Sequence, residues 1–170
     1  MNRGLEYLNA LADEDANAQF LKCCGAQNWA SAMTGARPFA DLEELVAKAD
    51  NVWRSLDPED WLEAFHAHPK IGEQKAATTQ SEQAHKWSKQ EQAGTQAAAP
   101  ETKSALAEGN RKYEERFGFI FIICASGKSA EEILASLNHR LGNEPEAELA
   151  IAAEEQRKIT RLRLEKLLEQ

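Results

Sequence analysis

Apolar side chains recur every three or four residues along most of this chain, a spacing typical of amphipathic helices. Between positions 41 and 56, for example, Leu45, Val46 and Ala49 would lie on one face of a helix, and charged side chains would lie on the other. The same spacing predicts further helices over residues 4–11, 15–24, 57–67, 81–93, 100–117, 129–141 and 145–168.

Several helix ends are marked by residues that favour them. Asp57 followed by Pro58 is typical of a helix N-terminus, because Asp caps the first turn and Pro is tolerated at the first helical position. His68 precedes Pro69, which disfavours helical geometry at His68, so this helix should end near Ala67. Glycines should end three other helices, at Gly25, Gly94 and Gly118.

Residues 119–125 interrupt the helical pattern with an almost wholly apolar run of aromatic and β-branched side chains. Such a run indicates either one buried strand or a buried extended segment, and the second is favoured because a single strand would have no partner. The small and polar residues 73–79 indicate a loop. We therefore expect an all-α fold: a single-domain helical bundle over residues 1–170, with about eight helices and one short buried extended segment.

Composition narrows the classes of function. The formal net charge of −8 and the pI near 5.1 argue against binding to nucleic acid or to an anionic membrane surface. No apolar run approaches the length of a membrane span, no signal peptide is visible, and the last residues are not a peroxisomal address. The odd number of cysteines fits a reducing compartment, and the histidines and cysteines lack the spacing of a zinc site. We expect a soluble, cytoplasmic protein without a metal.

A histidine at a helix end is the first candidate for chemistry. His68 would project from the C-terminus of its helix into a turn that Gly72 closes. The negative end of the helix dipole favours the protonated imidazole and would keep a proton donor available near neutral pH. A lone histidine before proline is more often structural, so the assignment depends on other segments.

Two of those segments could hold a ligand. Ser88, Glu91 and Gln92 would share a helix face that presents a hydroxyl, a carboxylate and an amide to a heterocycle, although such a face is usually only solvated. The buried backbone of residues 119–125 carries N–H and C=O groups that a ligand could pair with, although plain core is the simpler interpretation.

The last predicted helix carries an arginine on its apolar face. At about 100° per residue, Ala152, Ile159 and Leu167 share one face of this helix, and Arg163 falls in its middle. Arg161 lies well away from that face. A buried arginine is costly unless an anion pairs with it, and the pattern leaves open whether that anion is a protein carboxylate or a ligand.

These elements, in this order, resemble the 2-oxo-4-hydroxy-4-carboxy-5-ureidoimidazoline (OHCU) decarboxylase family, whose members form (S)-allantoin in urate degradation, a part of purine catabolism. The resemblance covers nearly the whole chain. It rests on motifs within 37–39, 68–72, 88–94, 113–125 and 155–164, among them His68-Pro69-Lys70-Ile71-Gly72 and Ser88-Lys89-Gln90-Glu91-Gln92.

The resemblance implies an all-helical fold, no cofactor, OHCU as the small-molecule substrate and usually a homodimer. It also implies that His68 is the catalytic residue and that Arg163 contacts the substrate. The other substrate-binding positions that it implies are Pro69, Ser88, Glu91, Gln92, Phe121, Ile122, Ile123, Cys124 and Ala125. Some members have an arginine after the apolar segment, where this chain has Ser126-Gly127-Lys128, and many animal members carry a peroxisomal signal that is not seen here. These differences favour a bacterial-type cytoplasmic enzyme.

The chain shows no motif for pyridoxal phosphate, thiamine diphosphate or a catalytic metal, so decarboxylation would rely on a C=N bond of the substrate as the electron sink. The protein would hold the ring, place the carboxylate and deliver one proton, with His68 as the general acid. Glu91 and Gln92 would hold N–H and C=O groups of the substrate. Two other interpretations share these features: a hydrolase acting on a related ureide or hydantoin, and a non-catalytic helical module that binds a small molecule.

Overall fold

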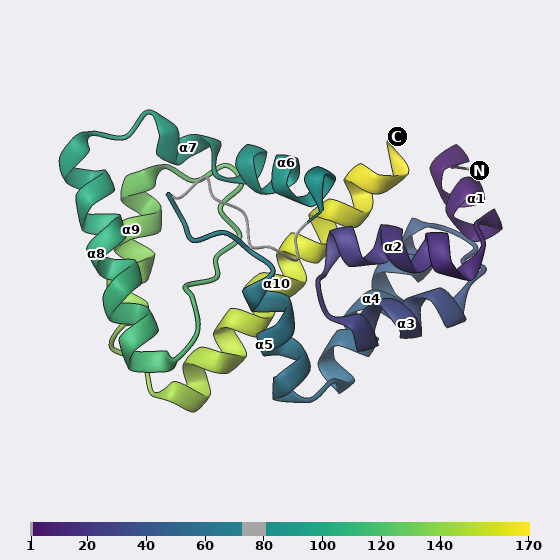
Figure 1. Cartoon of the computed structure of the whole chain (residues 1–170), viewed down its shortest axis with the longest axis horizontal. Coiled ribbons are helices and arrows are strands. Elements are labelled where there is room, and N and C mark those ends of the chain that lie inside the picture. Colours follow the sequence, from purple (N-terminus) through teal and green to yellow (C-terminus); the bar gives the residue numbers. More distant parts are fainter. Residues whose placement is uncertain (1, 73–80) are drawn as a thin grey trace. The chain divides into compact units, whose positions relative to one another are not determined.

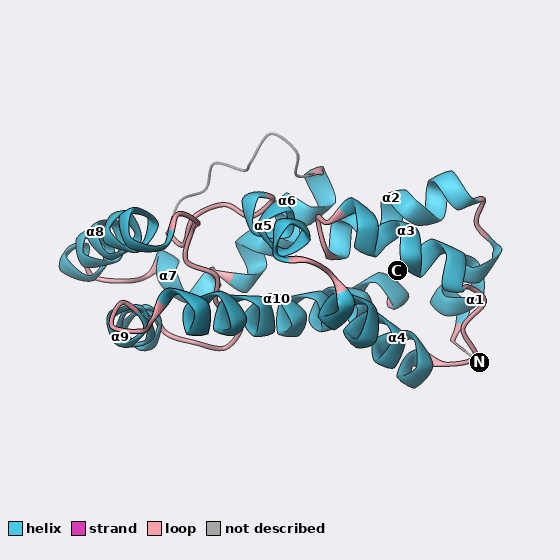
Figure 2. Ribbon diagram, turned by 90° about the horizontal axis from the view of Figure 1, so that it is seen from below, coloured by secondary structure: helices cyan, strands magenta, loops and turns pink. Residues whose placement is uncertain are grey.

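All regular secondary structure in the computed structural model is helical over the residues that it describes, 2–72 and 81–170 (Figures 1 and 2). An all-α fold is therefore confirmed. The loop predicted at residues 73–79 lies outside the described residues. The helices are α1 (Arg3–Ala10), α2 (Asp13–Cys23), α3 (Gln27–Ala36), α4 (Leu42–Ser55), α5 (Pro58–His66), α6 (Glu82–Glu91), α7 (Ala93–Gln96), α8 (Pro100–Phe117), α9 (Ala130–Arg140) and α10 (Pro145–Leu168). None of these ten is long and apolar enough to cross a membrane.

The chain divides into two compact units. The first contains the residues up to Ala64 together with Arg157–Gln170, and the second contains Phe65–Gln156. Because α5 and α10 both run across these boundaries, each of the two helices contributes residues to both units.

Buried aromatic side chains on α2 and α3 form the centre of the first unit. The ring of Phe20 packs edge-on against that of Trp29, with 5.9 Å between the ring centroids, and neither residue is exposed to solvent. The indole N–H of Trp29 donates to the carbonyl oxygen of Ala49 in α4 at 3.2 Å, which joins α3 to α4. A Cβ atom at Gly4 would lie 2.2 Å from the carbonyl oxygen of Leu168, so the backbones of α1 and α10 meet closely there.

In the second unit, α8 and α9 lie side by side (Figures 1 and 2) and the apolar segment 119–125 runs beside an aromatic cluster. The ring of Tyr113 makes edge contacts with Phe119 and Phe121, at centroid distances of 5.7 and 5.2 Å. Phe65, at the end of α5, lies 5.4 Å from Phe119. The segment is non-helical, forms no strand and is buried along most of its length, as expected for a buried segment without a strand partner.

Most helix ends lie within two residues of the predicted positions, and α8 and α10 have the predicted bounds. Gly118 ends α8 in the left-handed conformation, with a φ of 81°, as its position predicted. The prediction for Gly94 is wrong, because α6 already ends at Glu91 and Gly94 lies within α7. A Cβ at Gly94 would be 2.2 Å from the carbonyl oxygen of Lys128, so this glycine permits the close approach of two backbones.

Candidate active site

His68 lies in the turn that follows α5, two residues beyond the last helical residue. Its backbone N–H donates to the carbonyl oxygen of Phe65 at 3.1 Å, which extends the helix by one tight turn before Pro69. The imidazole is half-buried, and its Nε2 lies 2.6 Å from Oε1 of Gln156 in α10. Gln156 is completely buried, so one ring nitrogen of His68 is anchored to the interior of the second unit.

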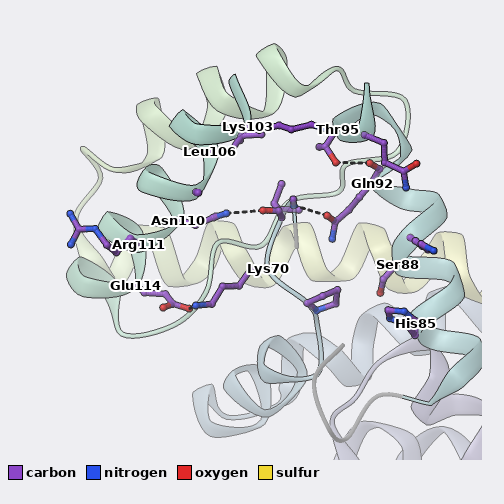
Figure 3. Close-up of a pocket in the computed structure, with 16 residues that line it drawn as sticks. Lys70, His85, Ser88, Gln92, Thr95, Lys103, Leu106, Asn110, Arg111 and Glu114 are labelled. Atoms are coloured by element: carbon purple, nitrogen blue, oxygen red, sulfur yellow. Dashed lines mark hydrogen bonds and ion pairs between the residues drawn. The ribbon is translucent and has the colours of Figure 1, made fainter. Parts of the chain in front are cut away.

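The loop after Pro69 is held at three points (Figure 3). Gly72, with a φ of 88°, turns the chain as predicted, and its N–H donates to Oε1 of Gln92 at 2.9 Å. The buried amide of Asn110 in α8 donates to the carbonyl oxygen of Ile71, also at 2.9 Å. Lys70 forms an ion pair with Glu114 at 3.1 Å. These contacts connect the His68 turn to both α6 and α8.

The predicted polar face of α6 is largely buried. Ser88 is 2% exposed and Glu91 is 8% exposed, while Gln92 follows the last residue of the helix and is half-buried. Burial of a carboxylate and a hydroxyl on one face is inconsistent with simple solvation, because buried polar groups are hydrogen-bonded and not hydrated. The solvated-face interpretation is therefore wrong for these residues.

A pocket of about 570 Å³ opens between α6, α8 and the loop after His68 (Figure 3), a size suited to a small ligand. Pro69, Ser88 and Gln92 of the predicted set line it, and Lys89 and Lys103 add positive charge. His68, Glu91 and residues 121–125 are not among its described lining residues. The pocket therefore contains only part of the predicted site. The candidate site is defined by the contacts of the His68 ring and of the segments beside it.

Residues 121–125 are tied down through their backbone. The carbonyl oxygen of Ile122 accepts a hydrogen bond from Nη1 of Arg140 at 2.7 Å. The N–H of Cys124 donates to Oε1 of Glu155 at 3.2 Å. Because Glu155 and Gln156 are consecutive residues of α10, one turn of that helix holds both this segment and the His68 ring.

A buried charged network also contacts this segment. Arg140 (5% exposed) and Glu148 (0% exposed) form a buried ion pair. The Nε of Arg140 donates a hydrogen bond to Oε1 of Glu148 at 2.7 Å. The Nη2 of Arg140 lies 2.6 Å from the same oxygen but makes no hydrogen bond to it. Tyr113 donates to the same carboxylate oxygen at 2.5 Å, and burial, followed by this contact, raises the pKa of the Tyr113 phenol. The guanidinium of Arg140 also lies over the ring of Phe121, 4.4 Å from its centroid.

Arg163 is buried, at 3% exposure, whereas the side chain of Arg161 is 55% exposed. The helix phase read from the sequence is thus confirmed. Arg163 belongs to the first unit, where its Nη1 donates to the carbonyl oxygen of Lys22 at 3.2 Å. In the same unit, burial raises the pKa of the Cys24 thiol to about 12, and the Ala26 N–H, the Thr160 side chain and the Arg163 charge oppose that rise in part.

Sequence reasoning missed several residues that hold the candidate site, above all Gln156, Glu155, Arg140 and Asn110. One of them carried a usable signal. Gln156 is four residues after Ala152 and seven before Arg163, so it lies on the same buried face of α10 that singled out the arginine. Glu155 begins the 155–164 motif, which did not single it out as a site residue. Arg140 and Asn110 occupy helix positions at which a charged or amide side chain is normally solvated, and nothing in the sequence marks them.

Comparison with known proteins places the chain in a family. A sequence model of OHCU decarboxylases matches residues 9–165. The uric acid degradation bifunctional protein TTL of Arabidopsis thaliana is 38% identical over 157 residues, which are 92% of this chain and 48% of that protein. The chain thus spans about half the length of that bifunctional relative. An OHCU decarboxylase of Amia calva is 35% identical over 144 residues, 82% of this chain and 79% of that protein.

Two solved structures have a similar fold. The crystal structure of OHCU decarboxylase in the presence of (S)-allantoin has a TM-score of 0.76 at 37% identity and covers 94% of this chain and 100% of that one. A crystal structure of (S)-allantoin synthase has a TM-score of 0.70 at 18% identity over 96% of this chain and 53% of that one, a likeness of fold alone. With a family model matching almost its whole length and a relative 35% identical over most of both proteins, the chain belongs to the OHCU decarboxylase family.

Proposed function

We propose that this chain decarboxylates OHCU to (S)-allantoin in urate degradation, without a cofactor and with His68 as the general acid. Membership of the family and similarity to an OHCU decarboxylase crystallised in the presence of (S)-allantoin support the reaction. The observation that carries the assignment to His68 is its anchored ring at a helix end, with Nε2 2.6 Å from a buried amide oxygen. An acid that delivers a proton to one face of a ring must be held in one orientation.

The proposed reaction needs little from the protein beyond placement and one proton. The bond between the carboxylate and the ring carbon breaks, carbon dioxide leaves, and the electron pair forms a C=C bond to the carbon of the adjacent C=N bond, whose own electron pair moves onto nitrogen. The hydroxyl on the carbon that lost the carboxylate gives its proton to that nitrogen as the ring carbonyl forms. The imidazolium of His68 then donates its proton to the ring carbon that becomes the stereocentre. Delivery from one fixed side produces the (S) configuration, whereas protonation by water would produce both enantiomers.

We propose that the buried helix face of α6 holds the substrate, with Glu91 accepting from its N–H groups and Ser88 and Gln92 completing the contacts. Gln92 already accepts from the Gly72 N–H through its Oε1, so its amide NH₂ is the group proposed to donate to the substrate. Pro69 and residues 121–125 would supply the walls, and Arg163 would bind a substrate oxygen. The N–H of Cys124 is committed to Glu155, so the N–H groups of Ile123 and Ala125 are the proposed backbone donors of that segment.

Circular dichroism tests the proposal directly. Freshly prepared OHCU should give optically active (S)-allantoin with the protein and racemic allantoin without it, while the absorbance of the substrate falls and carbon dioxide is released. A hydrolase would consume a ureide or hydantoin without releasing carbon dioxide, and a non-catalytic binding module would leave the absorbance at the spontaneous rate. Either result would overturn the proposed reaction.

His68→Ala and His68→Asn are the matched variants for the role of the acid. General acids commonly contribute a factor of about 10² to 10⁴, so the stereoselective rate should fall by that factor. The fold should be retained, because the half-buried ring sits in a turn rather than in the packed core. Retention of more than about a tenth of the activity would show that another group protonates the product.

We further propose that residues 1–170 act as one OHCU decarboxylase domain that works as a cytoplasmic homodimer. The family match extends through both compact units, the acidic net charge does not suit an anionic surface, and the resemblance described above implies a homodimer. Sedimentation equilibrium measures the mass of the assembly, and a mass of 18.9 kDa at micromolar concentration would contradict the dimer.

A further inference from the structure

We propose that Gln156 is a positioning residue that fixes the tautomer of His68, so that Nδ1 is the nitrogen that gives its proton to the substrate. The inference concerns the ring itself and, for its consequence in catalysis, rests on the proposed role of His68 as the acid. Nε2 of His68 lies 2.6 Å from Oε1 of Gln156.

The chemistry of the amide determines which ring nitrogen carries hydrogen. An amide oxygen can only accept, so a ring nitrogen that faces it at hydrogen-bond distance must be protonated. In the imidazolium form both nitrogens carry hydrogen, and the Nε2 hydrogen is bound to Gln156. The proton that can leave without breaking this bond is the one on Nδ1. After transfer, the neutral ring keeps its hydrogen on Nε2, and a proton from solvent restores the imidazolium.

Burial makes Gln156 suited to this task. The residue has no exposed surface, so its amide is enclosed by protein and shielded from water. Its neighbour Glu155 binds the N–H of Cys124 at 3.2 Å. The same turn of α10 therefore sets the orientation of the acid relative to the segment proposed to line the substrate.

The opposite amide orientation has a distinct consequence. If the NH₂ group of Gln156 faced Nε2, the neutral ring would carry its hydrogen on Nδ1, and Nε2 could not be the anchored donor. The tautomer of the neutral histidine therefore decides between the two orientations, and it can be measured without any assay of activity.

The experiment compares long-range ¹H–¹⁵N spectra of the intact protein with those of Gln156→Met and Gln156→Glu. The chain has four histidines, so the His68 signals are identified by their loss in His68→Asn. The wild type should show the Nε2–H tautomer when the ring is neutral. Gln156→Glu keeps an acceptor oxygen and should keep that tautomer alone, whereas Gln156→Met removes the acceptor and should admit a measurable fraction of the Nδ1–H form, as in a free imidazole.

Kinetics provide the second measurement. Gln156→Met should lower kcat about tenfold to a hundredfold and change KM much less, because the residue orients the acid and does not touch the substrate. Gln90 is exposed on α6, and Gln90→Met should leave both the spectrum and kcat unchanged, as a matched control. An Nδ1–H tautomer in the wild type, or a folded Gln156→Met protein with unchanged tautomer and kcat, would overturn the inference.

The spectra also separate this inference from the proposed function. A wild type that forms no optically active allantoin would defeat the decarboxylase assignment, yet the tautomer of His68 would still be read and would still decide the role of Gln156. If the wild type is active and the tautomer is independent of Gln156, the function stands and the positioning role fails.

Discussion

Replacing Glu148 by glutamine should destabilise the second unit strongly, although the change only replaces one carboxylate oxygen by an NH₂ group. The carboxylate is fully buried and accepts from three side chains: Arg140 at 2.7 Å, Tyr113 at 2.5 Å and Asn143 at 3.0 Å. Glutamine is neutral and has a single acceptor oxygen, so its NH₂ group must face at least one of these donors. Arg140 would remain buried without its counter-charge.

The magnitude follows from what Arg140 would keep. Breaking a buried ion pair by removing one partner costs about 3–5 kcal/mol. The lower end applies here, because the guanidinium retains the Ile122 carbonyl oxygen at 2.7 Å and its place over the Phe121 ring. For a chain of this length, about 3 kcal/mol corresponds to a fall in Tm of about 6–12 °C.

A thermal melt followed by circular dichroism measures the effect, and Glu146→Gln is the matched control because Glu146 is an exposed acid in the first turn of the same helix. Glu146→Gln should shift the Tm by no more than about 1–2 °C, as expected for surface substitutions. Activity should fall in Glu148→Gln even below its Tm, since Arg140 also holds residues 121–125. If both variants melted like the wild type, the buried network would not stabilise the unit as argued.

Four further outcomes are expected. Glu91→Gln should lower kcat/KM about tenfold to a hundredfold because a charged acceptor becomes neutral, and unchanged kinetics would remove Glu91 from the site. Arg163→Met should lower activity far more than Arg161→Met, since only Arg163 is buried; equal small effects would show that neither side chain meets the substrate. EDTA should leave the rate unchanged, and a loss that zinc or manganese restores would support a metal-dependent hydrolase. Burial raises the pKa of the Cys24 thiol from its ordinary value of 9.0 to about 12. Between these pH values the thiol ionises in the unfolded chain but stays neutral in the folded one, so the free energy of unfolding falls as the pH rises above 9. The Tm of the wild type should therefore fall more steeply above pH 9 than that of Cys24→Ala.

Local patterns predicted the elements of the fold well, because the residues that determine them are close in the sequence. The bounds of α8 and α10 follow from a proline at the start and an apolar period of 3.6 residues, and both match the structure. The ten residues of α3 formed only a short, weakly patterned stretch in the sequence, because alanines and small polar side chains dilute the apolar period there. That helix is defined by the burial of Trp29 and Met33, which depends on neighbours from other helices.

The candidate site was predictable only in part. Its polar residues stand in short sequence motifs, whereas the residues that hold them in place come from distant parts of the chain. His68, Ser88 and Gln92 stand in short motifs, so sequence alone could single them out. The contacts that hold them join positions far apart, such as Gln156 with His68 and Gln92 with Gly72. A single sequence carries no signal for such pairs. Gly94 is a similar case. A glycine is needed there because the Lys128 carbonyl oxygen lies too close for a side chain, and the sequence suggested instead that Gly94 ends a helix.

The arrangement explains why a site made of a turn and a non-helical segment can still be rigid. Glu148 and Glu155 are seven residues apart along α10, about two helical turns, so they lie on nearly the same face, and Gln156 follows about 100° further around the helix. Glu148 acts on Ile122 through Arg140, and the other two hold Cys124 and His68 directly. Loops are usually the most mobile parts of a domain, and a mobile acid would protonate either face of the intermediate. By fixing both loops to one helix, the fold would hold the proposed acid and the proposed substrate wall in place before the substrate arrives, as the proposed stereochemical control by His68 requires.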